Sequence, residues 1–257
     1  MLMGRNALYY EDYILAIQRF NSVISAKPYL AEPYFYRGLA KFYLEDYAGA
    51  ETDCTLALNK RPYTVQYYTL RALCRINMEM YDSAVSDYRE ALHQNPIERN
   101  NWHNMVLCLM ELERYEEADL ALDSMMLLWP RESSQCTMKA QVSLAKQDTV
   151  LAEEWVDSAL VLNNYDGNAW SMKASMYINR EEYKDAEAAL DKAIVQKPRL
   201  TGLYINRALT RFQQNNIRGA MSDYDQAIDI DANNYIAHHN RGLLRAQVGD
   251  DNRAIED

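Results

Sequence analysis

The chain of 257 residues carries 27 Lys and Arg against 37 Asp and Glu, which gives a formal net charge of −10. Binding of nucleic acid needs clustered basic side chains, and no basic stripe stands out in this acidic sequence, so nucleic acid is not an expected partner. No stretch approaches the ~20 apolar residues of a membrane-spanning helix, so membrane insertion by this chain is not expected either.

A fixed 34-residue period runs along the whole chain. One column of the pattern contains only alanine, at Ala16, Ala50, Ala84, Ala118, Ala152, Ala186, Ala220 and Ala254. A period of this size, without insertion or deletion, is typical of an array of one repeated unit whose stability comes from stacking. We therefore predict that residues 1–257 form a single array.

In chain order, the array has a partial unit at 1–30, complete units at 31–64, 65–98, 99–132, 133–166, 167–200 and 201–234, and a partial unit at 235–257. Each complete unit is expected to hold two helices. Small residues such as Gly38 and Ala50 mark where the two helices approach closely, and a proline such as Pro62 ends the second. Neither end carries a polar capping helix, so the chain is expected to be a fragment of a longer protein. The irregular unit at 133–166 is the expected place for a hinge.

The spacing of Tyr34, Gly38, Tyr47, Ala50 and Pro62 resembles that of the tetratricopeptide repeat, a helix-turn-helix unit of the same length. The likeness extends over the whole chain. It implies an all-α fold, namely a right-handed superhelical solenoid of antiparallel helix pairs. It also implies that the chain binds peptides or proteins and has no catalytic activity of its own.

In this family the first helices line the concave surface, and the resemblance assigns a set of partner-binding residues to that surface. They are Phe35, Tyr36, Leu39, Phe42, Tyr43, Leu73, Asn77, His103, Asn104, Asn206 and Asn240. An intramolecular interpretation stays open, in which the aromatic residues only pack between neighbouring first helices. The columns that hold Lys and Asn in relatives that clamp chaperone carboxylates read Phe35 and Leu39 here, so a co-chaperone role is not expected. Other relatives hold an extended peptide backbone with a ladder of asparagines, since an amide both donates and accepts. The resemblance therefore implies a short ladder at Asn104, Asn206 and Asn240, which occupy that column here.

Two columns of charged residues vary together along the array. Arginine precedes the small-residue column in four units, and aspartate stands 16 residues later in the same four. Columns that co-vary indicate contact, and the planar guanidinium suits a two-pronged bond to a carboxylate. We predict structural ion pairs between the two helices of these units, namely Arg37–Asp53, Arg71–Asp87, Arg207–Asp223 and Arg241–Asp257.

The four cysteines, Cys54, Cys74, Cys108 and Cys136, are expected to be core thiols. Equivalent helices of adjacent repeats lie ~8–10 Å apart, which is too far for a Cys74–Cys108 disulfide. A contact between Cys54 and Cys74 stays open. The sequence has no Cys-x-x-Cys, no His-Glu-x-x-His and no glycine-rich phosphate loop, so no metal, cofactor or catalytic residue is expected.

The expected function is that of a non-catalytic scaffold that binds a peptide or helix of a protein partner on its concave face. One alternative is a targeting or regulatory array of an enzyme whose catalytic domain lies outside this sequence. Another is a homo-oligomer that forms through the uncapped ends, because exposed apolar helix faces associate. The sequence identifies neither the partner nor the compartment; a soluble cytoplasmic protein is the default, and export stays open if a parent protein carries a signal peptide.

Overall fold

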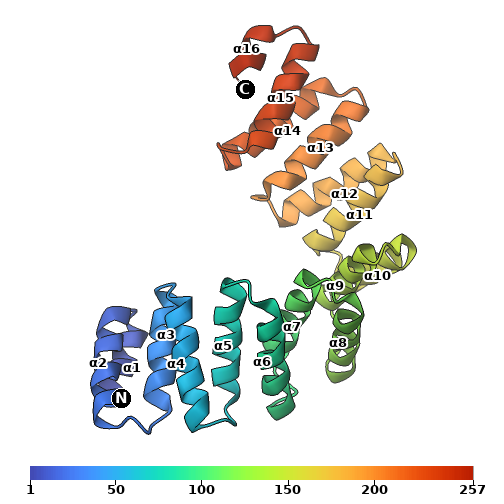
Figure 1. The fold of residues 1–257 in the computed structure, drawn as a ribbon. Helices are drawn as coiled ribbons and strands as arrows, with labels where there is room; N and C mark the ends of the chain where they lie inside the picture. The colour runs from blue at the N-terminus through green and yellow to red at the C-terminus, as the bar shows by residue number, and fades with distance from the viewer. Residues whose placement is uncertain (257) are drawn as a thin grey trace. The chain divides into compact units, whose positions relative to one another are not determined.

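The structure, a computed structural model, describes residues 1–256, which are helical with short turns and contain no strand (Figure 1). The prediction of an all-α helical-repeat solenoid is confirmed. The first helices of the repeats are α1 (Leu2–Tyr9), α3 (Glu32–Tyr43), α5 (Val65–Asn77), α7 (Arg99–Glu111), α9 (Ser133–Ala145), α11 (Gly167–Asn179), α13 (Thr201–Gln213) and α15 (Tyr235–Gln247). The second helices are α2 (Tyr13–Ala26), α4 (Tyr47–Lys60), α6 (Tyr81–Gln94), α8 (Tyr115–Leu128), α10 (Thr149–Leu162), α12 (Tyr183–Gln196), α14 (Ile217–Ile230) and α16 (Asp251–Glu256).

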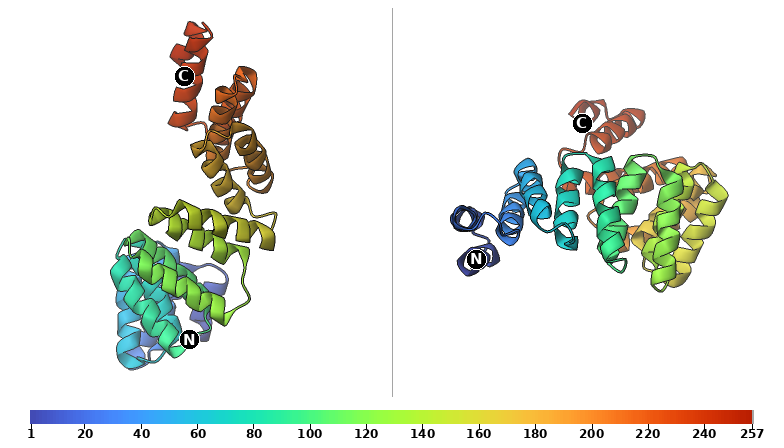
Figure 2. Two further views of the ribbon diagram at one scale, coloured as in Figure 1. Left: turned by 90° about the vertical axis from the view of Figure 1, so that its right-hand side faces the viewer. Right: turned by 60° about the horizontal axis from the view of Figure 1, so that its bottom comes forward.

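The contacts divide the chain into two compact units, of which the first is Met1–Trp129 and the second begins at Pro130. In the first unit each helix from α1 to α8 packs on the next, and α3 also touches α5. In the second unit the same succession runs from α9 to α16. The helices of the first unit stand side by side in two views (Figure 1 and Figure 2). Because each unit is defined by its own contacts, a single array over residues 1–257 stays a prediction.

The columns of small residues lie where the two helices of a repeat touch. A Cβ atom added to Gly38 of α3 would lie 3.2 Å from the carbonyl oxygen of Ala50 and 3.2 Å from the Cβ atom of Asp53, both on α4. In the next repeat Ala72 and Ala84 are fully buried at the corresponding positions. A larger side chain would overpack this contact at a cost of about 1–3 kcal/mol.

The turn from first to second helix contains a left-handed residue in each repeat, which the sequence analysis missed. The φ angle is 63° at Glu45, 59° at Glu79 and 56° at Glu113, and 80° at Gly249. A left-handed conformation is unfavourable for a residue with a Cβ atom. The second helix then starts from a capped position in several repeats, as where the Asp46 carboxylate accepts a 2.9 Å bond from the Gly49 amide.

The aromatic column of the first helices ties down the loop that joins two repeats. The Trp102 indole donates a 2.8 Å hydrogen bond to the carbonyl of Pro96, six residues earlier. Trp170 makes the same bond to Asn164, also at 2.8 Å, and the Tyr204 hydroxyl reaches its own loop carbonyl at 3.0 Å. Each bond satisfies a polar tip on an otherwise apolar ring, and it fixes the start of one repeat against the end of the previous one.

Candidate functional site

Buried carboxylates on the second helices hold the charged side chains of the first helices. Asp87 on α6 accepts bonds from Arg71 on α5 at 3.0 and 2.6 Å and from Arg75 at 2.8 Å. Its side chain is only 3% exposed. The guanidinium of Arg71 also donates to Thr55 of the preceding repeat at 3.1 Å. These contacts fix α5 against α6 and link the repeat to its neighbour.

The same arrangement recurs in two further repeats. Asp53 is bonded by Arg37 at 2.9 and 2.5 Å and paired with Lys41 at 2.9 Å. Asp223 is bonded by Arg207 at 3.0 and 2.6 Å and by Arg211 at 2.8 Å in the second unit. The fourth predicted pair, Arg241–Asp257, ends on a residue outside those that the structure describes.

The sequence analysis missed the second cation of each cluster, although a signal for it exists. Lys41, Arg75, Arg211 and Arg245 stand four residues after the paired arginines, and they occur in the same four repeats. Burial alone would lower the pKa of Arg207, but its hydrogen bonds to Asp223 and Asp191 outweigh burial and raise that pKa. These groups therefore keep fixed charges and have a structural function.

The predicted aromatic residues of the first unit pack largely against one another. Phe35 lies with its ring centroid 4.9 Å from that of Tyr67 on α5. Tyr36 stacks on Phe20 of α2 at 5.7 Å. Tyr43 stacks on a tyrosine of α2 at 5.1 Å yet remains 55% exposed. Much of the aromatic surface is thus occupied by intramolecular contacts, while part of it, as at Tyr43, remains exposed to solvent.

Three of the predicted partner-binding residues, Phe35, Leu39 and Leu73, converge on one groove in the first unit. The groove crosses α3, α5 and the start of α7, and its volume is about 280 Å³. The rest of its lining is Val65, Gln66, Thr69, Leu70, Glu98, Asn100 and Asn101. It combines an apolar floor with a polar rim at the end nearest α7, which is the usual composition of a binding site.

The other predicted residues of the first unit lie outside this groove. Phe42 packs edge to face on Tyr47 at 5.4 Å. Asn77 is exposed, and its amide donates back to the Leu73 carbonyl at 2.9 Å. His103 is exposed and Asn104 is half-buried, both on α7.

The second unit has a smaller groove of about 230 Å³ across α13, α14 and α15. It is lined by Leu209, Phe212, Tyr224, Asn240, Leu243, Leu244 and Gln247. Of the predicted residues it contains Asn240, whereas Asn206 is half-buried outside it. Since Asn104 belongs to the first unit and the other two asparagines to the second, the ladder stays a prediction.

Family models match three stretches of the chain. The model described as "Tetratricopeptide repeat" matches residues 65–97 and 167–198, and the model described as "TPR repeat" matches residues 208–249. The chain carries tetratricopeptide repeats in these stretches. Such repeats support a role as a protein-interaction scaffold. Among curated proteins, none matches the sequence significantly.

Solved structures share the fold at low sequence identity. One is a tetratricopeptide repeat protein from Parabacteroides merdae, with a TM-score of 0.72, 16% identity and coverage of 94% of this chain and 95% of that one. Another is the C-terminal part of a repeat-containing protein from Cytophaga hutchinsonii, with a TM-score of 0.69, 14% identity and coverage of 91% and 96%. A third is a chain of the APC/C hetero-tetramer Cut9–Hcn1, at a TM-score of 0.63 and 16% identity; the match covers 90% of this chain and about half, 48%, of that one.

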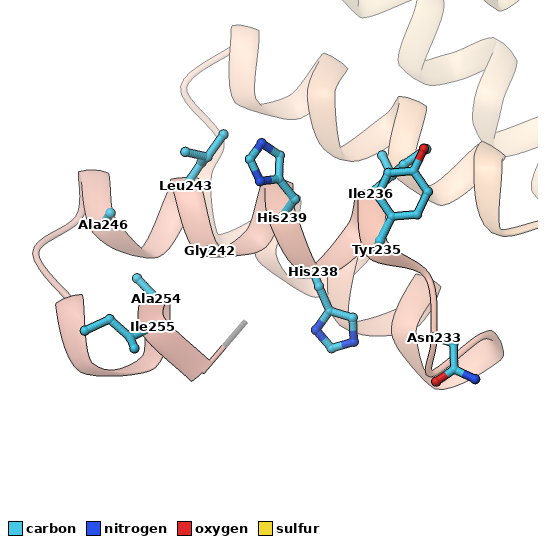
Figure 3. A pocket seen from close by; sticks show the side chains of 10 residues that line it. All are labelled: Asn233, Tyr235, Ile236, His238, His239, Gly242, Leu243, Ala246, Ala254 and Ile255. Carbon is cyan, nitrogen blue, oxygen red and sulfur yellow. The ribbon is translucent and has the colours of Figure 1, made fainter.

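A wide hollow lies on the last helix pair, α15 and α16 (Figure 3). Its volume is about 1160 Å³, and its lining is Asn233, Tyr235, Ile236, His238, His239, Gly242, Leu243, Ala246, Ala254 and Ile255. In the preceding repeat the residues corresponding to His238, His239 and Gly242 are Tyr204, Ile205 and Ala208, which are buried in a cluster with residues of α15. The hollow is therefore a stacking face of the repeat, and association of copies through it stays a prediction. Figure 3 shows the two histidines pointing to opposite sides of α15, so they do not converge on a ligand.

The four cysteines are free and buried. A hydrogen bond with Cys74, together with burial, raises the pKa of the Cys54 thiol, which keeps it protonated and unreactive. Within residues 1–256 no group of His, Cys, Asp or Glu side chains could hold a metal ion. None of the helices described has both the length and the apolar character needed to cross a membrane.

Proposed function

We propose that the chain is a non-catalytic scaffold that binds a peptide segment of a protein partner on the inner face of its first helices. The observation that carries this proposal is the convergence of Phe35, Leu39 and Leu73 on one groove of the first unit. These residues come from two first helices that are neighbours in the stack. A groove shared between repeats exists only when the repeats are stacked, and the stack holds it open in advance of binding.

The size of the groove favours one or two side chains of a peptide over a small molecule. At about 280 Å³ it lies just below the ~300–1,000 Å³ typical of small-molecule pockets. A Leu, Ile or Phe side chain that becomes fully buried there contributes about 1.5–3 kcal/mol. Because the helices that carry the groove are rigid, little ordering free energy opposes binding on the side of the scaffold.

Selection of peptides from a random library on the whole chain tests the proposal. Leu73→Arg places a charge in the groove and is expected to lower the affinity for the selected peptides at least tenfold, which corresponds to about 1.4 kcal/mol. The matched control is Leu120→Arg on α8, at a side chain that is already 66% exposed. Equal affinities for both variants, or no enriched peptide, would contradict the proposal.

A further inference from the structure

We infer that the groove across α3, α5 and α7 selects a peptide segment in which a bulky apolar side chain lies next to a cationic group. The cation would be a lysine, an arginine or a free N-terminal amine. The inference rests on the proposed function, because it assigns a ligand chemistry to the same groove. Two polar residues at the α7 end, Asn101 and Glu98, carry it.

Asn101 is a buried amide with an unused donor. The side chain is fully buried, its Oδ1 accepts a 3.0 Å bond from the Thr69 hydroxyl, and its Nδ2 has no partner among the described residues. An unsatisfied buried polar group costs about 1–3 kcal/mol and is rare in proteins. The corresponding residues of most other repeats are apolar, since the column reads Pro33, Tyr67, Asn101, Gln135, Ala169, Leu203 and Ala237.

The missing partner of Asn101 is a hydrogen-bond acceptor in the groove. Asn101 is part of the groove lining, and the terminal torsion of an asparagine side chain is soft. A small rotation therefore presents the N–H group to a carbonyl oxygen of a bound peptide, while the Thr69 hydroxyl can donate or accept as needed. Binding would then satisfy a donor that the unbound chain leaves unsatisfied.

Glu98 supplies the charge. It is the half-buried residue just before α7, and it is the only titratable residue that lines the groove. No ion pair to it occurs among the described residues, whereas Asp53, Asp87 and Asp223 are each bonded by two cations. The adjacent Arg99 lies over the Trp129 ring, with its guanidinium carbon 5.2 Å from the centroid.

An unpaired carboxylate beside an apolar floor defines the partner by charge complementarity. Charges attract more strongly in a partly desolvated groove than in bulk water, so a cation next to the buried side chain gains affinity there. The net charge of −10 acts in the same direction at long range and repels anionic ligands. The groove thus fits an apolar–basic peptide and disfavours an acidic one.

Peptides selected from a random 12-residue library on the whole chain test the inference directly. We expect them to share a bulky apolar residue next to Lys or Arg. Synthetic versions in which that cation is replaced by norleucine should bind about three- to tenfold more weakly to the wild-type chain, in line with about 1 kcal/mol for such a contact. The isosteric variant Glu98→Gln should lower the affinity of the basic peptides by a similar factor and leave the norleucine peptides unchanged. Glu90→Gln, at an exposed residue of α6, is the matched control.

Asn101→Leu tests the amide separately. It is expected to bind the selected peptides about three- to tenfold more weakly while its melting temperature equals or exceeds that of the wild type, because an unsatisfied buried group is removed. If this variant does not fold, the affinities measured with Glu98→Gln and with the norleucine peptides test the inference without it. Peptides that lose affinity on Leu73→Arg but respond neither to Glu98→Gln nor to removal of their cation would overturn this inference and leave the proposed function standing. Peptides whose affinity is also unchanged by Leu73→Arg would overturn both this inference and the proposed function.

Discussion

Removal of the Asp87 carboxylate is expected to destabilise its repeat far more than removal of an exposed aspartate on the same helix. Asp87 is 3% exposed, and the two arginines that donate to it, Arg71 and Arg75, are 16% and 17% exposed. Asp87→Ala would leave the largely buried guanidinium of Arg71 without a carboxylate partner and Arg75 paired with Glu51 alone. Breaking a buried ion pair in this way costs about 3–5 kcal/mol. We expect the lower end, about 3 kcal/mol, because both arginines keep some contact with water. Asp82→Ala is the control, since Asp82 is 78% exposed and its pair with Arg114 is worth at most ~1 kcal/mol.

Urea unfolding followed by the fluorescence of Trp102 and Trp129, which both lie in the first unit, measures these costs. Hydrogen exchange of the amides in α5 and α6 shows whether the loss is local, as a stack of repeats requires. The triple variant with Asp87→Leu, Arg71→Met and Arg75→Met should recover most of the stability lost in Asp87→Ala, because the one charge that it leaves without its partner, Glu51, is 24% exposed. Equal costs for Asp87→Ala and Asp82→Ala would refute the reasoning.

Three further predictions concern stability. Glu79→Gly should stabilise the chain by up to about 1 kcal/mol in urea unfolding, because φ at Glu79 is 59° and glycine adopts this conformation without a Cβ clash. The control, Glu90→Gly inside α6, should instead cost about 1 kcal/mol. Trp102→Phe removes the bond to a loop carbonyl, so it should cost about 0.5–1.5 kcal/mol and speed hydrogen exchange at the start of α7. Hydrogen bonds from Arg180 and, to a smaller extent, Lys173 lower the pKa of Glu153 from 4.5 to about 2. The free energy of unfolding that the wild type gains over Glu153→Gln should therefore be present in full above pH 4.5 and be lost as the pH falls through 2.

The repeat architecture could be predicted from the sequence because the same residue types recur at the same positions of successive repeats. The alanine column and the glycine at position 38 lie at the helix contacts, as small residues must, and the prolines that follow second helices, such as Pro62, lie just after their ends. The charged columns reflect contacts for the same reason, since a guanidinium and a carboxylate buried together must change together along the array. Arg37 and Asp53, which are 16 residues apart, meet through two hydrogen bonds.

Features that the residue type does not signal, or that depend on one repeat alone, could not be predicted from the period. The left-handed turn is occupied by Glu45, Glu79 and Glu113, and glutamate does not signal this conformation, whereas Asn215 and Gly249 at the same position of later repeats do. The orphan amide of Asn101 is visible only when its neighbours are placed around it. Likewise, the packing of Phe35 on Tyr67 shows how much of a predicted binding surface is used inside the molecule.

Site-specific photo-crosslinking tests the central claim most directly. A benzophenone amino acid is placed at Gln66, an exposed residue that lines the groove, or at Leu120 on α8, and each chain is irradiated with a peptide selected on the wild type. The account predicts a crosslink from position 66 that unlabelled peptide suppresses, and none from position 120. A crosslink from position 120 alone would place the ligand on another surface and contradict binding along the inner face.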